Sequence, residues 1–194
     1  MQPLMKQLNL DHQRFSRLFT CVQYQLDLFR SGNRLLPDIK LILNVLDYMQ
    51  AYPEFWHHPS EDVLFSELLD RDIPQSSTVE SLLIEHQELE CATRSIKSAF
   101  KDCILNDFLP GESLIDEAYE YLDRQLTHLG TEKNAIYPVV GIYLSEQAIR
   151  NLHLNRNEVN DPLFGTQLES KYDNLFQEIR TADIQMQRDG FSFV

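Results

Sequence analysis

The chain has 194 residues, of which 43% are hydrophobic, so it is long enough for one domain to bury a core. Its formal net charge of −13 argues against nucleic acid and against an anionic membrane surface as partners. The three cysteines form no C-x-x-C pair, and no apolar run approaches the ~20 residues of a membrane span. We therefore expect a soluble, cytoplasmic protein without a zinc–cysteine cluster or a disulfide framework.

Two helices are predicted in the first third of the chain. The first begins near Asn9, with Asn9 or Asp11 as its N-cap, and ends before the turn signals at 31–38. The second spans 38–69, with Asp38 as its N-cap candidate, and its apolar residues recur at intervals of three and four positions. Two prolines within 52–59 remove backbone donors from this helix, so we expect a kink or a short break there.

Three further helices are predicted. A capping box of the form S-x-x-E at 77–80 marks the start of a third helix, which runs to about position 103. After a turn that contains adjacent proline and glycine, a fourth helix spans about 112–144. The apolar pattern then weakens through a loop at 155–165, and a fifth helix is predicted over about 167–188.

These elements predict an all-α fold, an up-and-down antiparallel four-helix bundle with an additional C-terminal helix. We expect residues 1–145 to form the bundle. Residues 146–194 are expected to form a C-terminal helical extension that packs on the bundle or on a second subunit. A homodimer and an unknown protein partner are therefore both compatible with the sequence.

Each of the four bundle helices contains a histidine suited to binding a metal: His12, His57, His86 and His128. Two of them are followed four positions later by a glutamate, His57 by Glu61 and His128 by Glu132. Residues four apart lie on the same helix face, so each pair can present an imidazole and a carboxylate to one point. Inward-facing glutamate and histidine on facing helices are the ligands from which bundles build paired metal sites.

The spacing of these histidines predicts that they lie at one level of the bundle. In an antiparallel bundle, residues at the same height on successive helices are equidistant from the turn between them. The midpoint of each successive pair falls within one of the predicted turns, at 31–38, 71–75 and 105–112. His153 fails this test, because its midpoint with His128 falls in an apolar run, and we expect it to take no part in metal binding.

The donor types restrict the choice of metal. Imidazole and carboxylate without thiolate suit iron, manganese or zinc, and two bridging glutamates favour a pair of metals over a single ion. If both metals are six-coordinate and share one bridging oxygen, positions stay open for water, dioxygen or another ligand. Glu90, four residues after His86, could fill one of them. Open positions favour a reactive site over a structural one.

Four motifs resemble those of bacterial hemerythrin-like proteins of the HHE cation-binding type. They are Asp11-His12, the segment YPEFWHHPSEDVLF at 52–65, Ile84-Glu85-His86, and the segment HLGTE at 128–132. The resemblance covers about residues 8–145, and HHPSED is its most specific part.

The resemblance implies a non-haem di-iron centre, oxo- or hydroxo-bridged, with both glutamates bridging and the ligands His12, His57, Glu61, His86, His128 and Glu132. Oxygen-carrying hemerythrins use a fifth histidine where this chain has Glu90, which argues against simple reversible oxygen carriage. His58 is predicted to lie beside the ligands or at the surface, because adjacent residues of a regular helix point about 100° apart.

We therefore expect a non-haem di-iron protein that binds or senses dioxygen, nitric oxide or iron through open iron positions. One alternative is a di-iron enzyme acting on peroxide or oxygen, or an iron donor in iron–sulfur cluster repair. Another is a bundle whose histidines are incidental. Four tyrosines are candidates either for hydrogen bonding near the metals or for ordinary packing: Tyr24, Tyr48, Tyr119 and Tyr121.

Overall fold

The computed structural model describes residues 3–31, 37–154, 161–165 and 170–189, which contain helices and turns but no strand. The all-α class predicted from the sequence is confirmed. Two of the elements, η1 and η2, are π-helical turns, and η3 is a 3-10 turn. In chain order the elements are α1 (Pro3–Ser31), α2 (Ile39–Ala51), η1 (Pro53–His57), α3 (His58–Leu69), α4 (Ser76–Leu105), α5 (Glu112–Thr131), η2 (Glu132–Ile136), α6 (Tyr137–Tyr143), α7 (Glu146–Leu154), η3 (Ser170–Tyr172) and α8 (Asp173–Arg188).

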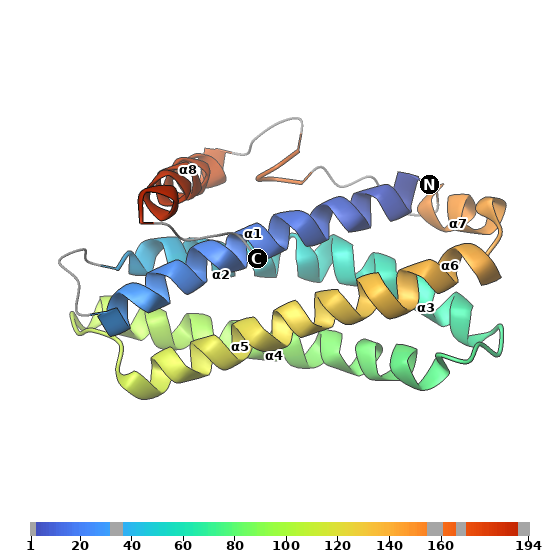
Figure 1. Cartoon of the computed structure of the whole chain (residues 1–194), viewed down its shortest axis with the longest axis horizontal. Coiled ribbons are helices and arrows are strands. Elements are labelled where there is room, and N and C mark those ends of the chain that lie inside the picture. Colours follow the sequence, from blue (N-terminus) through green and yellow to red (C-terminus); the bar gives the residue numbers. More distant parts are fainter. Residues whose placement is uncertain (1–2, 32–36, 155–160, 166–169, 190–194) are drawn as a thin grey trace.

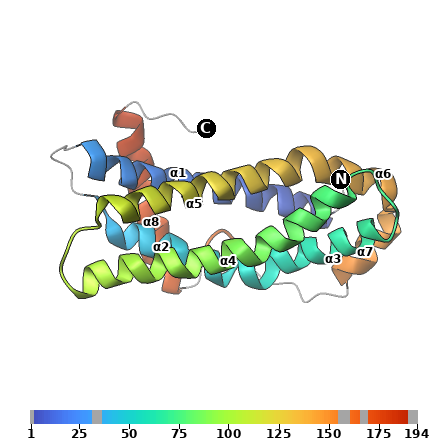
Figure 2. The same ribbon diagram turned by 90° about the horizontal axis from the view of Figure 1, so that it is seen from below.

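Four long rods lie side by side along the longest dimension of the molecule (Figures 1 and 2). They are α1, α2–η1–α3, α4 and α5–η2–α6, and successive rods run in opposite directions (Figure 1). Contacts join α1 to α2 and α5, and join α4 to α2, α3 and α5, so each rod packs beside two others. Buried apolar side chains from all four rods form one core. No helix in the described part of the chain combines the length and apolar composition that a membrane crossing requires.

The first helix is longer than the sequence analysis predicted. It begins at Pro3, so Asn9 and Asp11 lie in its interior and the prediction that one of them is its N-cap is wrong. Leu4 and Leu8 are buried and extend the apolar stripe by two turns towards the N-terminus, which explains the earlier start. Asp11 is also buried, so its carboxylate contacts the interior of the bundle and does not cap a helix end.

The predicted N-cap of α2 is confirmed, whereas the predicted start of α4 is wrong. Asp38 caps α2 as predicted, and its carboxylate accepts two backbone N–H groups of the first turn. The predicted capping box does not form, because α4 begins at Ser76 and Ser77 lies inside its first turn. The N-cap residue is Gln75, which makes no side-chain capping bond. The Ser76 hydroxyl instead donates to the carbonyl of Ile73 in the preceding turn, at 2.6 Å.

The break predicted within 52–59 is a π-helical turn, and a second one interrupts the last rod. Each turn closes on the residue that precedes a proline. His58, before Pro59, donates its backbone N–H to the carbonyl five residues earlier, and Tyr137, before Pro138, does the same. Because proline has no N–H and clashes with the preceding turn of an α-helix, the wider turn relieves both problems.

The C-terminal region contains one helix that the sequence analysis missed. The α7 helix packs against α1 and α3, and His153 lies on it. The predicted fifth helix is present as α8, which packs against α1 and α2, whereas its predicted start at Gln167 lies outside the described residues. Arg17 of α1 forms an ion pair with Asp183 of α8. Part of the predicted loop at 155–165 and most of the predicted turn at 31–38 also lie outside the described residues.

Candidate metal centre

The structure brings the six predicted site residues together in the interior of the bundle. The four histidines come from four different rods, and all six side chains are at least nine-tenths buried. The two glutamates lie on α3 and at the first position of η2, one turn after the histidine that precedes each of them. The residues brought together are His12, His57, Glu61, His86, His128 and Glu132.

The carboxylate of Glu61 faces three of the histidines. Its Oε1 atom lies 3.4 Å from Nε2 of His12. Its Oε2 atom lies 3.3 Å from Nε2 of His57 and 3.6 Å from Nε2 of His86. The carboxylate of Glu61 therefore contacts histidines from two other rods, in addition to the expected contact with His57 four residues earlier on its own rod.

The carboxylate of Glu132 has the complementary arrangement. Its Oε2 atom lies 3.3 Å from Nε2 of His12, and its Oε1 atom lies 3.1 Å from Nε2 of His86 and 3.2 Å from Nε2 of His128. His12 and His86 thus face both glutamates. Two carboxylates placed between two pairs of imidazoles form a donor set that suits a pair of metal ions.

Three of the histidines present the other ring nitrogen, Nδ1, to an outer carboxylate. The pairs are His57 with Asp11 at 3.2 Å, His86 with Asp62 at 2.6 Å, and His128 with Glu85 at 2.9 Å. A carboxylate on Nδ1 holds the ring in place and favours a proton on that nitrogen. The inward-facing Nε2 then has a free lone pair, as a metal ligand requires.

Several inward-facing atoms of the cluster lack a hydrogen bond. They are Nε2 of His57 and His128, and Oε2 of Glu61 and Glu132, and all are buried. Buried polar atoms are nearly always hydrogen-bonded, so four such atoms in one cluster require an explanation. Among the described residues, three sets have ligand atoms within 4.8 Å of one another: His12, His57 and Glu61; Glu61, His86 and Glu132; and His58, His86 and His128. The first two sets share Glu61. The residues therefore fit a metal pair that shares Glu61.

The pKa values show how the cluster balances its charge when no metal is bound. Burial alone would raise the pKa of Glu132, but the charge of His128 and the hydrogen bond with His86 hold it well below its ordinary value. Burial disfavours a charge on His12 and His86, yet neighbouring carboxylates raise their pKa values to about 9 and about 10. Burial lowers the pKa of His57 to about 3. Protons on two histidines thus occupy positions that a metal ion would take.

Tyr137 is a residue of the centre that the sequence analysis missed. Its hydroxyl lies 2.9 Å from Nε2 of His12 and donates to Oε1 of Glu61. Burial raises its pKa well above the ordinary value, so the phenol keeps its proton. The signal was present in the sequence, because Tyr137 follows Glu132 by five positions and precedes a proline. A π turn places residues five apart on the same face, whereas an α-helix does not.

The four tyrosines named in the sequence analysis have other partners. The hydroxyl of Tyr24 donates to Asp189 at 2.6 Å, and that of Tyr119 donates to Asp27. The remaining two belong to the core: Tyr121 hydrogen-bonds with Thr93 at 2.9 Å, and Tyr48 stacks on Tyr52 with ring centroids 5.9 Å apart. These contacts favour the packing interpretation for all four.

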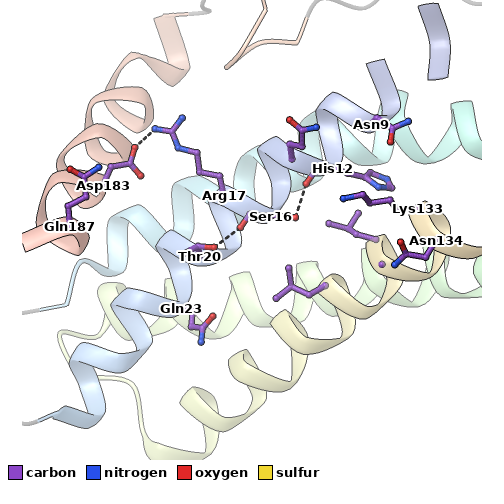
Figure 3. A pocket seen from close by; sticks show the side chains of 14 residues that line it. Asn9, His12, Ser16, Arg17, Thr20, Gln23, Lys133, Asn134, Asp183 and Gln187 are labelled. Atoms are coloured by element: carbon purple, nitrogen blue, oxygen red, sulfur yellow. Dashed lines mark hydrogen bonds and ion pairs between the residues drawn. The ribbon is translucent and has the colours of Figure 1, made fainter. Parts of the chain in front are cut away.

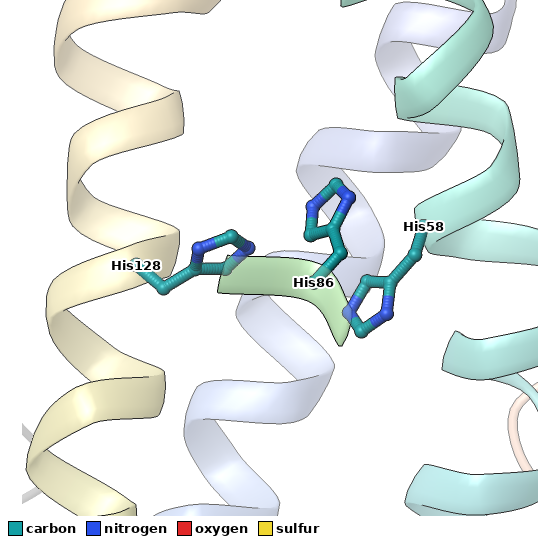
Figure 4. Close-up of side chains that lie close together, drawn as sticks. All are labelled: His58, His86 and His128. Carbon is teal, nitrogen blue, oxygen red and sulfur yellow. The ribbon is translucent and has the colours of Figure 1, made fainter. Parts of the chain in front are cut away.

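His58 is buried, so of its two predicted positions, beside the ligands or at the surface, the structure shows the first. Its ring stacks on that of His86, with centroids 4.4 Å apart and planes 7° from parallel (Figure 4). Its Nδ1 atom lies 3.6 Å from Oε1 of Glu90, a carboxylate with 26% of its side chain exposed. The π turn that ends at His57 explains how the ring of His58 turns inward beside a predicted ligand, because the 100° rotation assumed in the sequence analysis holds only for a regular helix.

A groove of about 750 Å3 reaches the centre from outside, between α1, α5, η2 and α8 (Figure 3). Of the six predicted ligands, His12 is the one that lines it. Polar side chains form much of its wall, among them Lys133, Asn134 and the ion-paired Arg17. The groove therefore borders the centre at the buried side chain of His12.

Comparison with known proteins identifies the family. A family model described as the Hemerythrin HHE cation binding domain matches residues 4–140, which include all six site residues. Neither the curated proteins nor the solved structures contain a match to the chain. Because the family model covers well over half of the chain and its description agrees with the histidine and glutamate clusters found in the interior, the protein belongs to the hemerythrin HHE cation binding domain family.

Proposed function

We propose that the protein is a non-haem di-iron protein that binds or senses dioxygen, nitric oxide or iron through open iron positions. The observation that carries the proposal is the convergence of four histidine Nε2 atoms on two buried carboxylates, each of which has one oxygen, Oε2, without a hydrogen bond. The proposal includes an up-and-down, antiparallel arrangement of the four rods. The opposite directions of successive rods support that arrangement.

In this proposal the two iron ions are oxo- or hydroxo-bridged and share both glutamates. The contact pattern supports one pair of histidines for each ion, His12 with His57 and His86 with His128. When bound, the iron pair supplies a reversible change of oxidation state and Lewis-acid positions for a diatomic ligand. No thiolate donor takes part, which agrees with the preference of iron for imidazole and carboxylate.

The chain itself orients the ligands and excludes water. Phe15 packs edge-on against His57 with ring centroids 4.8 Å apart, and Phe65 lies 6.0 Å from His86. Such an apolar surrounding limits the access of solvent to reactive positions. The hydroxyl of Tyr137, which contacts both His12 and Glu61, is a hydrogen-bond donor within the centre.

Two features favour the alternative of a di-iron enzyme acting on peroxide or oxygen, or of an iron donor in cluster repair. A buried phenol that keeps its proton beside the centre is suited to stabilise, by a hydrogen bond, the charge that develops on oxygen when an oxygen–oxygen bond is cleaved. The groove at His12 is suited to exchange of iron with another protein. We propose residues 1–145 as the metal-binding bundle and 146–194 as an extension that packs on the bundle or on a second subunit. Contacts of α8 with α1 and α2 support the first arrangement.

The first test is elemental analysis of the purified protein with its ultraviolet–visible spectrum in air and after anaerobic reduction. The proposal predicts about two iron ions per chain, with oxygen-bridge absorption that bleaches on reduction and returns in air. Failure to bind iron after reconstitution with ferrous iron would refute it. Rapid consumption of peroxide by the iron-loaded protein would favour the enzyme over the carrier or sensor.

A further inference from the structure

We propose that segment 161–165 responds to the state of the metal centre, because iron binding at His57 and the docking of this segment on the bundle strengthen each other. Arg14 and Asp161 are the positioning residues that connect the two. The inference rests on the proposed function, since it requires iron at His57. It gives the C-terminal extension a role in sensing, because the metal centre then controls how firmly one part of that extension is held.

Asp11 is the first link between His57 and the segment, and four groups converge on its buried carboxylate. Its Oδ2 atom accepts a hydrogen bond from the hydroxyl of Tyr52 at 3.2 Å and lies 3.2 Å from Nδ1 of His57. Its Oδ1 atom accepts from the side-chain amide of Gln7 at 2.7 Å and lies 3.6 Å from Nη1 of Arg14. The ring of His57 is therefore held by a carboxylate that three other side chains hold in turn.

Arg14 is the second link, and it joins α1 to segment 161–165. Its Nη1 atom lies 3.1 Å from Oδ2 of Asp161, and its Nη2 atom donates to the backbone carbonyl of Phe164 at 3.0 Å. The carboxyl groups of Asp11 and Asp161 are both buried, and both face this guanidinium. Burial raises the pKa of Asp161, so its carboxylate is costly to bury and depends on Arg14.

Segment 161–165 is a turn built around the same carboxylate that Arg14 holds. Oδ1 of Asp161 accepts the backbone N–H groups of positions 163 and 164 at 2.9 Å each. The backbone carbonyl of Asp161 accepts the N–H group of position 165 at 2.8 Å. A looser contact between Arg14 and Asp161 should therefore release the turn as a unit and expose these three amides to exchange with water.

An aromatic contact route joins the same two ends. The ring of Phe164 packs edge-on against Tyr48, with centroids 6.0 Å apart. Tyr48 stacks on Tyr52, with centroids 5.9 Å apart, and the hydroxyl of Tyr52 donates to Asp11. The segment thus reaches Asp11 both through the guanidinium and through packed rings.

The coupling acts through the two nitrogens of the His57 ring. A carboxylate at Nδ1 makes an imidazole a better metal ligand, and loss of such a partner typically lowers metal affinity by about 10–100-fold. Because coupling between two binding events is reciprocal, iron at Nε2 of His57 strengthens the contact of Nδ1 with Asp11. A more firmly held Asp11 fixes Arg14, and Arg14 then holds segment 161–165.

Hydrogen exchange of the amides at 163–165 tests the coupling in the full-length chain, metal-free and loaded anaerobically with ferrous iron. We expect iron to slow their exchange at least about fivefold more than it slows exchange in α8. Equal slowing in both places would overturn the inference, because general stabilisation would account for it. No slowing at 163–165 in a chain that binds two iron ions would overturn it alone, whereas a chain that binds no iron would overturn the proposed function as well.

The control variant is Asn44→Ala. Asn44 donates to Glu178 of α8 at 2.9 Å, so it ties the extension to α2 through a different contact. This variant should speed up exchange in α8 and leave the effect of iron at 163–165 unchanged. Loss of the iron effect in Asn44→Ala would show that any loosening of the extension has the same result, which would overturn the specific role of Arg14.

Arg14→Gln removes the link, and Arg14→Lys keeps its positive charge. In Arg14→Gln we expect the affinity for one of the two iron ions to fall by about three- to tenfold, less than for a partner that contacts the ring directly. Only one of the two iron signals in the Mössbauer spectrum should change, because His57 belongs to one iron. Arg14→Lys should restore part of the affinity and part of the iron effect on exchange.

Two results with these variants would contradict the assignment. Iron affinity and exchange that match the wild type in Arg14→Gln would show that the link carries no coupling. Equal losses in both variants, with changes in both iron signals, would show a general structural role. If Arg14→Gln fails to fold, Asp161→Asn replaces it, since asparagine keeps the acceptor oxygen of the turn and removes the charge that faces Arg14.

Discussion

The two halves of the bundle are built from the same four rods but differ in the chemistry of their interior side chains. In the half nearer the turn at 105–112, the rods meet through apolar side chains, and the cavity found among these side chains has a volume of only about 10 Å3. Members of this apolar half are Phe19, Val22, Ile42, Val45, Leu46, Ile96, Phe100, Ala118, Tyr121 and Leu122. In the other half, the corresponding interior positions hold histidines, glutamates and Asp11, all buried.

Along each rod, the residues that stabilise the fold are therefore separate from the residues that form the candidate metal centre. Apolar packing stabilises the first half without any ligand, because it removes hydrocarbon from water. The polar half contains carboxylates and imidazoles that are costly to bury, and several of their atoms lack hydrogen bonds. A bound metal pair would supply the missing partners, so the polar half should depend on metal and the apolar half should not.

The largest expected effect is the loss of both iron ions in Glu132→Ala. Glu132 contacts three histidines, and no other described carboxylate can replace its bridge. Elemental analysis after reconstitution measures the loss directly. Glu88→Ala is the matched control, because Glu88 is an exposed carboxylate that pairs with Arg124 outside the centre. Two iron ions per chain in Glu132→Ala would contradict a bridging role.

Phe100→Ala tests the apolar half. Phe100 is fully buried, and deleting a buried phenylalanine side chain typically lowers the free energy of unfolding by about 3–5 kcal/mol. We expect that loss in the metal-free protein, measured by chemical denaturation, with the iron content of the folded variant unchanged. Loss of iron from a variant that still folds would show that the two halves are not independent.

The dependence of iron affinity on pH tests the charge balance of the polar half. Without metal, the pKa values of His12 and His86 are raised to about 9 and about 10, so both rings hold protons at neutral pH. Iron must displace these protons, and each displaced proton strengthens apparent binding about tenfold per pH unit. Affinity should therefore rise by up to about a hundredfold between pH 7 and pH 8. Competition with a chelator of known affinity measures this change, and a flat or falling profile would show that these histidines do not exchange protons for metal.

Much of the division between a polar and an apolar half can be predicted from the sequence, because it depends on the spacing of residues along regular helices. The midpoints between the histidines identified a common level, and the structure places their Nε2 atoms around two carboxylates. Asp11 was assigned to a helix end, although its partner is His57 on a different rod. The sequence shows an aspartate beside a predicted ligand, but it does not show which distant ring that aspartate meets.

The two residues whose positions in the centre the sequence analysis did not derive lie next to the two π turns. Tyr137 and His58 each close an i→i+5 bond immediately before a proline. One extra residue in a turn changes the direction of every later side chain relative to a regular helix, so an argument based on 3.6 residues per turn fails there. A proline close after a predicted ligand is the signal that would have found both.

The smallest effect is expected at the outer edge of the polar half, where Asp62 contacts Nδ1 of His86 at 2.6 Å. Asp62→Asn keeps an oxygen acceptor but removes the charge, so the ring stays in place while its inward nitrogen becomes a weaker donor. Loss of such an outer partner typically lowers metal affinity by about 10–100-fold. Because 44% of the Asp62 side chain is exposed, unfolding of the metal-free protein should change little. Glu67→Gln on the same helix is the control, since Glu67 pairs with Arg71 away from the centre. If Asp62→Asn bound iron as tightly as this control, only the six inward ligands of the polar half would contribute to iron affinity. A weaker affinity would show that the carboxylates that orient the histidines contribute as well.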